Sequence, residues 1–104
     1  AADTLGTPVH KGLVLTQALF YPGLLESKIP LYAKAGVLAM ENEVASLLVV
    51  ASLHGVKAGA IVTADAPAFG LVDVEDYQPD EEEVMRMVEK QIDIALDAVI
   101  KVEV

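Results

Sequence analysis

Two glutamates separated by one residue, Glu41 and Glu43, are the strongest candidates for chemistry in this chain. They lie between a short apolar run that begins at Gly36 and a long apolar stretch with the character of a buried helix. In α/β proteins, ligands bind where strands end and helices begin. An ionised carboxylate at such a place can accept paired hydrogen bonds from the neighbouring hydroxyls of a sugar, because it offers only acceptors. The alternative is structural: both glutamates would complement the positive end of the helix dipole, for about 0.3–1 kcal/mol each.

The composition excludes several classes of function. The chain has 104 residues, of which 54% are hydrophobic, so we expect a single packed domain. Its net charge of −9 repels nucleic acid and anionic membranes. Arg86 is the only arginine, so the chain alone is poorly equipped to bind phosphate. Cysteine is absent, which excludes disulfides and thiolate metal sites, and we expect no metal and no cofactor.

The sequence carries no membrane or export signal that we can identify. The longest apolar run, Val44–Leu53, is too short to span a bilayer, and no charged-then-apolar leader opens the chain. We therefore expect a cytoplasmic protein. The acidic stretch over residues 73–83 is interpreted as a solvated loop and a helix start, because it lacks the ligand spacing of a calcium loop.

Apolar patterning predicts alternating strands and helices. The expected elements are a strand over Val9–Leu15, a turn at Phe20–Gly23, a short helix over Pro30–Ala35, a strand over Val37–Met40, a helix over Glu43–Leu53 and a strand over Val56–Thr63. This order is typical of an α/β sheet with parallel members.

The helix predicted over Glu43–Leu53 is apolar almost all round. Such a helix is expected to be buried on most sides, against a sheet or in a subunit interface. Asn42 is the expected N-cap, and Gly55 suits the position just past the C-terminal end. His54 lies in the last turn, where its positive form would favour the helix dipole, so we interpret it as structural rather than catalytic.

A final helix is predicted after a loop over residues 66–78. Asp80 can cap this helix, and Glu83 completes a capping-box pattern three residues later. Its expected apolar stripe comprises Val84, Val88, Ile92, Leu96 and Val99. Two supporting i,i+4 ion pairs are expected, Glu82 with Arg86 and Asp97 with Lys101. We interpret it as a docking helix without chemistry of its own.

Several blocks of sequence resemble a known family. They are Ala2-Asp3-Thr4-Leu5-Gly6, His10-Lys11-Gly12-Leu13, Phe20-Tyr21-Pro22-Gly23, the block Gly36–Glu43 and Gly55-Val56-Lys57-Ala58-Gly59. In this order they resemble the C-terminal part of the hexameric-type nucleoside phosphorylases, and Phe-Tyr-Pro-Gly is most similar to the uridine phosphorylase branch. The resemblance implies an α/β three-layer sandwich with a central mixed, partly parallel sheet. Residues 1–104 would form the C-terminal part of one such domain.

The resemblance also implies roles for individual residues. Phe20 would pack against the nucleoside base, and Glu43 would bind the ribose hydroxyls. Asn42 would lie beside the sugar, where the family has methionine, and Glu41 would flank the pocket. The partners would be a nucleoside and, as co-substrate, phosphate; the products would be a free base and ribose 1-phosphate.

Three departures from the family pattern concern specificity. Asn42 replaces an apolar methionine with an amide that needs hydrogen-bond partners. Leu24 and Glu26 occupy the positions from which uridine phosphorylases bond uracil through Gln and Arg. Purine phosphorylases place a catalytic Asp where Ala66 aligns here. Asp65, one residue away, is therefore either a general acid for purine N7 or a turn residue.

The arginine-rich phosphate site of the family has no counterpart in this chain, so we expect the chain alone to be inactive. Ala1–Gly6 is similar to the end of a helix, which predicts that the sequence is a fragment. The first hypothesis is a uridine-phosphorylase-like enzyme that is active when complete. The alternatives are a purine nucleoside phosphorylase, a nucleosidase that uses water, and a non-catalytic relic or subunit-assembly module. The resemblance implies a homo-oligomer.

Overall fold

The computed structural model describes residues 1–19, 21, 23–68, 78 and 80–102. The chain divides into two compact units, one comprising residues 12–59 and 66–77, the other comprising residues 1–11, 60–65 and 78–104. The first unit holds both strands found among the described residues, and two of the helices. We call it the βαβ unit, and we call the other the terminal unit.

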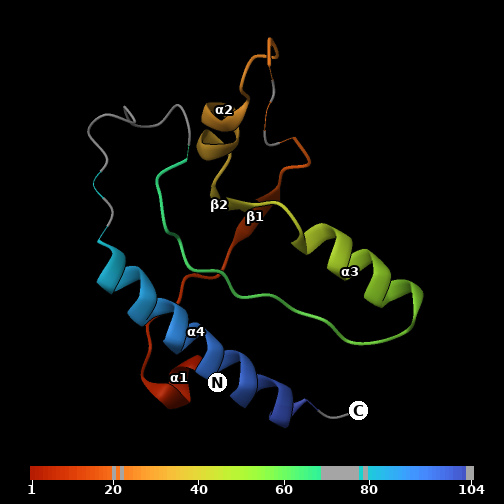
Figure 1. Ribbon diagram of the computed structural model, residues 1–104. Coiled ribbons are helices and arrows are strands. Elements are labelled where there is room, and N and C mark those ends of the chain that lie inside the picture. Colours follow the sequence, from red (N-terminus) through yellow and green to blue (C-terminus); the bar gives the residue numbers. More distant parts are fainter. Residues whose placement is uncertain (20, 22, 69–77, 79, 103–104) are drawn as a thin grey trace. The chain divides into compact units, whose positions relative to one another are not determined.

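A parallel pair of strands forms the centre of the βαβ unit (Figure 1). β1 (Leu13–Thr16) pairs with β2 (Val37–Glu41), and the register places Thr16 opposite Glu41. An irregularity between Leu13 and Val14 interrupts the pairing at its start. The connection runs through α2 (Ile29–Lys34), which contacts β2. A strand–helix–strand connection of this kind is the basic unit of parallel sheets, so the predicted α/β class is confirmed.

Local signals position α2 as the sequence predicted. Pro30 lies in the first turn, where its missing N–H costs nothing. Gly36 has a φ of 88°, a left-handed conformation that suits glycine, and it directly precedes β2. The helix runs from Ile29 to Lys34, one residue earlier than predicted at each end.

α3 (Val44–Leu53) follows β2 after two residues. Its N-cap is Glu43, so the prediction of Asn42 as N-cap is wrong. At the other end, His54 is the C-cap and Gly55 follows with a φ of 65°, as expected for the glycine that ends a helix. Among its residues only Ala51 is buried, while Leu53 is 80% exposed. The described residues therefore do not bury this helix on most sides.

The strand predicted over Val56–Thr63 is wrong, because residues 56–63 form no regular element. A strand needs a partner for its backbone N–H and C=O groups, and an apolar run does not provide one. The first strand is also shorter than predicted: β1 begins at Leu13 rather than Val9 and extends to Thr16.

The terminal unit contains α1 (Ala2–Leu5) and α4 (Glu81–Lys101). α1 ends at Gly6, which has a φ of 66°, as the first residues of the sequence predicted. The N-terminal ammonium lies 4.0 Å from Asp97 Oδ2. Thr63 donates its hydroxyl proton to Gln91 Oε1 over 2.5 Å, and this bond ties residues 60–65 to α4.

α4 begins as predicted but uses a different face. Asp80 accepts a hydrogen bond from the N–H of Glu83 at 3.0 Å, which confirms it as the N-cap. Ile94 is the buried residue of the helix, whereas Ile92, Leu96 and Val99 of the predicted stripe are exposed. From Val84 to Leu96 the stripe has a spacing of four, which drifts by about 40° per step around a helix of 3.6 residues per turn. The predicted stripe therefore lies on a different face of α4 from the buried residue Ile94.

The predicted ion pairs of α4 are confirmed in one case of two. Lys101 pairs with Asp97 at 2.6 Å, as expected. Arg86 pairs with Glu83 at i,i+3 rather than with Glu82 at i,i+4. Both pairs are largely exposed and contribute little to the free energy of unfolding, about 0.2–1 kcal/mol each.

The described residues form a two-stranded sheet. The three-layer sandwich with a mixed central sheet therefore stays a prediction. Ala51 and Ile94 are the buried hydrophobic residues in the described part of the chain.

Candidate functional site at the carboxyl ends of β1 and β2

The two strands deliver polar side chains to one edge of the sheet. Thr16 and Glu41 are the last residues of β1 and β2, and they are register partners. The N–H of Gln17 donates to the carbonyl of Glu41 at 2.8 Å, which extends the strand pairing by one bond. Because the strands are parallel, both carboxyl ends meet at this edge, the usual position for ligands in α/β sheets.

The carboxylate of Glu41 connects three elements. Its Oε1 accepts a hydrogen bond from the hydroxyl of Thr16 on β1. Its Oε2 accepts from the backbone N–H of Glu43 and of Val44, each at 2.6 Å. These two N–H groups belong to the start of α3, where the helix has no partners of its own for them. Glu41 thus acts as the acceptor for the N-terminus of α3, the structural role that the sequence left open.

The Thr16 hydroxyl completes this arrangement. It donates to Glu41 and also accepts a hydrogen bond from the N–H of Ala45 at 3.0 Å. One hydroxyl can do both, since it has one donor and two acceptor lone pairs. β1, β2 and the first turn of α3 are therefore joined by four hydrogen bonds, which we call the Thr16–Glu41 junction.

The junction sets the protonation state of Glu41. The side chain is half-buried, and burial alone would raise the pKa of its carboxyl group. The hydrogen bonds from Thr16, Val44 and Glu43 stabilise the ionised form and outweigh that effect, so the pKa of Glu41 is lowered. Glu41 therefore stays ionised at neutral pH and keeps its acceptors directed at α3.

Glu43 differs from Glu41 although the two lie two positions apart. It is exposed, with a φ of −126° and a ψ of −24°, and its side chain makes no capping hydrogen bond. Its backbone N–H is held by Glu41. The main chain of Glu43 is thus anchored, while its carboxylate is exposed beside the carboxyl ends of the strands. Asn42, between them, is also exposed.

The other predicted site residues are distributed as follows. Phe20 lies outside the described residues. Leu24 and Glu26 are exposed in the connection between β1 and α2. Asp65 is exposed and belongs to the terminal unit, whereas Glu41, Asn42 and Glu43 belong to the βαβ unit. The roles of Phe20, Asn42 and Asp65 toward a substrate stay predictions.

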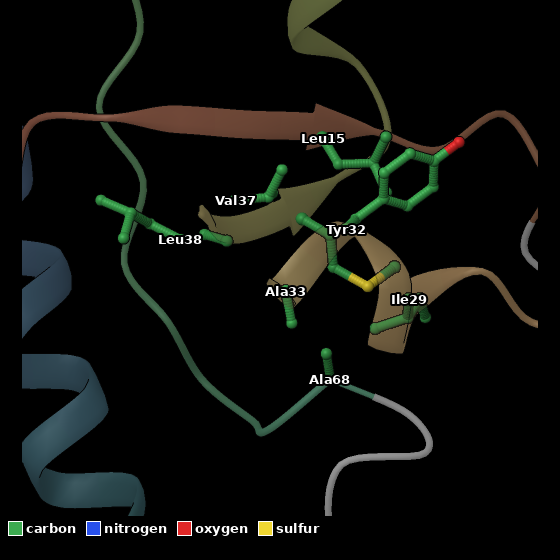
Figure 2. A pocket seen from close by; sticks show the side chains of 9 residues that line it. Leu15, Ile29, Tyr32, Ala33, Val37, Leu38 and Ala68 are labelled. Atoms are coloured by element: carbon green, nitrogen blue, oxygen red, sulfur yellow. The ribbon is translucent and has the colours of Figure 1, made fainter. Parts of the chain in front are cut away.

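An apolar hollow lies beside the sheet within the βαβ unit (Figure 2). It is lined by side chains of β1, β2 and α2 together with Ala68, among them Leu15, Tyr32 and Val37. Its volume of about 60 Å³ is far below the roughly 300–1,000 Å³ of pockets that hold small molecules. We therefore interpret it as a packing gap and place the candidate site at the junction.

Sequence reasoning missed Thr16. The available signal was its position, since it directly follows the apolar residues of the first strand. Glu41 was a candidate because it follows a predicted strand. Thr16 follows the other predicted strand of the parallel pair, so the same argument applies to it.

Among the described residues, no group of His, Cys, Asp or Glu side chains is arranged to hold a metal ion. None of the helices in the described part is long and apolar enough to cross a membrane.

Comparison with known proteins decides the family. A family model described as 'Phosphorylase superfamily' matches residues 1–101. The chain belongs to the phosphorylase superfamily. No solved structure matches it significantly.

Curated relatives of this superfamily member are named as purine nucleoside phosphorylases. The protein of that name from Plasmodium falciparum is 34% identical over 101 residues, which cover 96% of this chain and 40% of the relative. The one from Plasmodium vivax is 37% identical over 65 residues, covering 62% of this chain and 26% of the relative. A DeoD-type purine nucleoside phosphorylase from Colwellia psychrerythraea is 44% identical over 62 residues, covering 60% and 26%. The chain therefore spans at most 40% of the length of these relatives.

Proposed function

We propose that this chain takes part in the phosphorolysis of nucleosides, with Glu43 as the group that binds the sugar. The observation that carries the proposal is the contrast at the junction. The carboxylate of Glu41 is committed to Thr16 and to the N-terminus of α3, whereas that of Glu43 is exposed and makes no capping bond. An anchored residue with an available carboxylate suits the hydroxyls of a ribose.

In this reaction a phosphate oxygen forms a bond to C1′ of the sugar while the bond from C1′ to the base nitrogen breaks. The electron pair of that bond leaves with the base, which takes up a proton. The transition state resembles an oxocarbenium ion, so groups that hold the ribose and stabilise charge on the leaving base lower its energy. Glu43 supplies the first of these functions, and Asp65 is the proposed proton donor to the base.

The arginine-rich phosphate site that the family resemblance implies has no counterpart in these 104 residues. The one arginine of the chain, Arg86, is paired with Glu83 on α4. Residues outside this chain, in the same polypeptide or in another copy, would then supply the positive groups of the phosphate site. This is why we propose a role in phosphorolysis rather than activity of the isolated chain.

The proposed base is a purine. The relatives described above are named for purine nucleosides. In addition, the positions that bond uracil in the uridine phosphorylases hold Leu24 and Glu26, which supply no matching donors. Uridine is the second candidate, favoured by the Phe-Tyr-Pro-Gly motif. A non-catalytic assembly module is not favoured, because these relatives are named as enzymes.

The test is a phosphate-dependent assay of base release from inosine and from uridine, made on the protein as its source organism produces it. We expect inosine to be cleaved, and Glu43→Ala to lower kcat/KM roughly 10- to 100-fold, the range for losing hydrogen bonds to a charged group. The matched control is Glu81→Ala, which removes an exposed glutamate from the first turn of α4 and should leave the rate unchanged. Absence of phosphate-dependent cleavage of both nucleosides would contradict the proposal.

A further inference from the structure

We propose that Thr16 is a positioning residue for the sugar-binding carboxylate of Glu43, to which it is linked through Glu41 and the first turn of α3. The inference rests on the proposed function for the identity of the ligand, a ribose-containing nucleoside. The hydrogen-bonded junction on which it stands is independent of that function. Thr16 would touch no substrate.

Two hydrogen bonds connect Thr16 to Glu43 through the carboxylate of Glu41. The Thr16 hydroxyl donates to one oxygen of Glu41, and the other oxygen of Glu41 accepts from the N–H of Glu43 at 2.6 Å. Only one carboxylate lies between the hydroxyl and the backbone of the proposed sugar-binding residue. Without Thr16, Glu41 Oε1 loses its donor, and the carboxylate can rotate away from the α3 amides.

A second hydrogen-bonded path connects Thr16 directly to the first turn of α3. Thr16 Oγ1 also accepts from the N–H of Ala45 at 3.0 Å, so it contacts α3 directly as well as through Glu41. The two paths hold consecutive peptide groups, those of Glu43, Val44 and Ala45. The direction in which the Glu43 side chain leaves the main chain depends on these peptide groups.

The exposed carboxylate of Glu43 needs such support. Glu43 is exposed and its side chain makes no capping bond, so within the described residues its carboxylate depends on the main chain for its direction before a sugar binds. A binding group must be held close to its productive geometry by neighbours that are themselves held. The Thr16–Glu41 junction provides that support. The geometry of Glu43 therefore depends on Thr16 of β1, which is distant from it in the sequence.

The test is Thr16→Val, which keeps the shape of the side chain and removes the hydroxyl. Steady-state kinetics on the protein as its source organism produces it would give KM separately for nucleoside and for phosphate. We expect the nucleoside KM to rise roughly three- to tenfold, the loss typical of one hydrogen bond, with the phosphate KM unchanged. Thr16→Ser, which restores the hydroxyl, should return the nucleoside KM to within about twofold, because both bonds can re-form. Thr4→Val, the same change at an exposed position of α1, should leave both KM values unaltered.

A second readout separates this inference from the proposed function. Nuclear magnetic resonance of the same variants reports the amide signals of Glu43, Val44 and Ala45. We expect Thr16→Val to shift all three and Thr16→Ser to restore them. If the parent protein cleaves no nucleoside, the dissociation constant for inosine is measured on the variants in place of KM. A parent protein that also binds no nucleoside would overturn both the inference and the proposed function. Unmoved amide signals, or moved signals with unchanged nucleoside affinity, overturn the role of Thr16 alone.

Discussion

At the scale of single residues, Glu41 and Glu43 show how two identical side chains acquire different tasks. Glu41 is the last residue of β2 and faces Thr16 across the strand pair, so its oxygens meet a hydroxyl and two helix amides. Glu43 lies two positions on, at the N-cap, and its carboxylate remains exposed. The sequence pattern indicated the pair but could not divide the roles, because the division depends on Thr16, 25 residues away.

The lowered pKa of Glu41 predicts an acid dependence of stability. Its pKa lies below the usual value of 4.5, so the folded state binds its proton less readily than the unfolded state. The stabilisation is fully present above pH 4.5 and is lost as pH falls through the lowered pKa. We expect Glu41→Gln to remove this part of the pH dependence, measured as the free energy of unfolding in urea between pH 7 and pH 3. Glu89→Gln removes an exposed carboxylate of α4 outside the junction and should retain that dependence; equal curves for the two variants would contradict the account.

At the scale of elements, the N-terminus of α4 is the clearest local determinant of structure. Asp80 accepts from the N–H of Glu83, three residues ahead, and three glutamates occupy the first turn. We expect Asp80→Ala to lower the free energy of unfolding by about 1 kcal/mol. Asp80→Asn should be nearly neutral, since asparagine caps equally well. Thermal and urea unfolding would measure both; an asparagine variant as unstable as the alanine variant would mean that charge rather than capping is responsible.

What the sequence predicted correctly was local in origin. The Asp80 cap, the end of α3 at Gly55 and the end of α1 at Gly6 each depend on a few neighbouring residues. The prediction of a strand over residues 56–63 was wrong, because a strand requires a partner strand elsewhere in the chain. The predicted N-cap of α3 was wrong for a related reason. Asn42 had the right residue type for a cap, but the amides of Glu43 and Val44 are bonded by Glu41, which lies opposite Thr16 of β1.

At the scale of the whole molecule, the described residues leave much apolar surface uncovered. Leu47, Val50 and Leu53 of α3 are all more than half exposed, and Ala51 and Ile94 are the buried hydrophobic residues of the described part. An exposed apolar helix face marks an interaction surface more often than a free one. The homo-oligomer implied by the family resemblance would cover such a surface and stays a prediction.

Binding of the ribose hydroxyls by Glu43 is tested by a thermodynamic cycle that combines one mutation in the protein with one change in the substrate. The measurement is kcat/KM for inosine and for 3′-deoxyinosine, on the parent protein and on Glu43→Ala. We expect the parent protein to prefer inosine by roughly 10- to 100-fold, because the 3′-hydroxyl bonds a charged group. Glu43→Ala should lose most of that preference. A variant that retains the full preference would show that the hydroxyl is held elsewhere and would contradict the account.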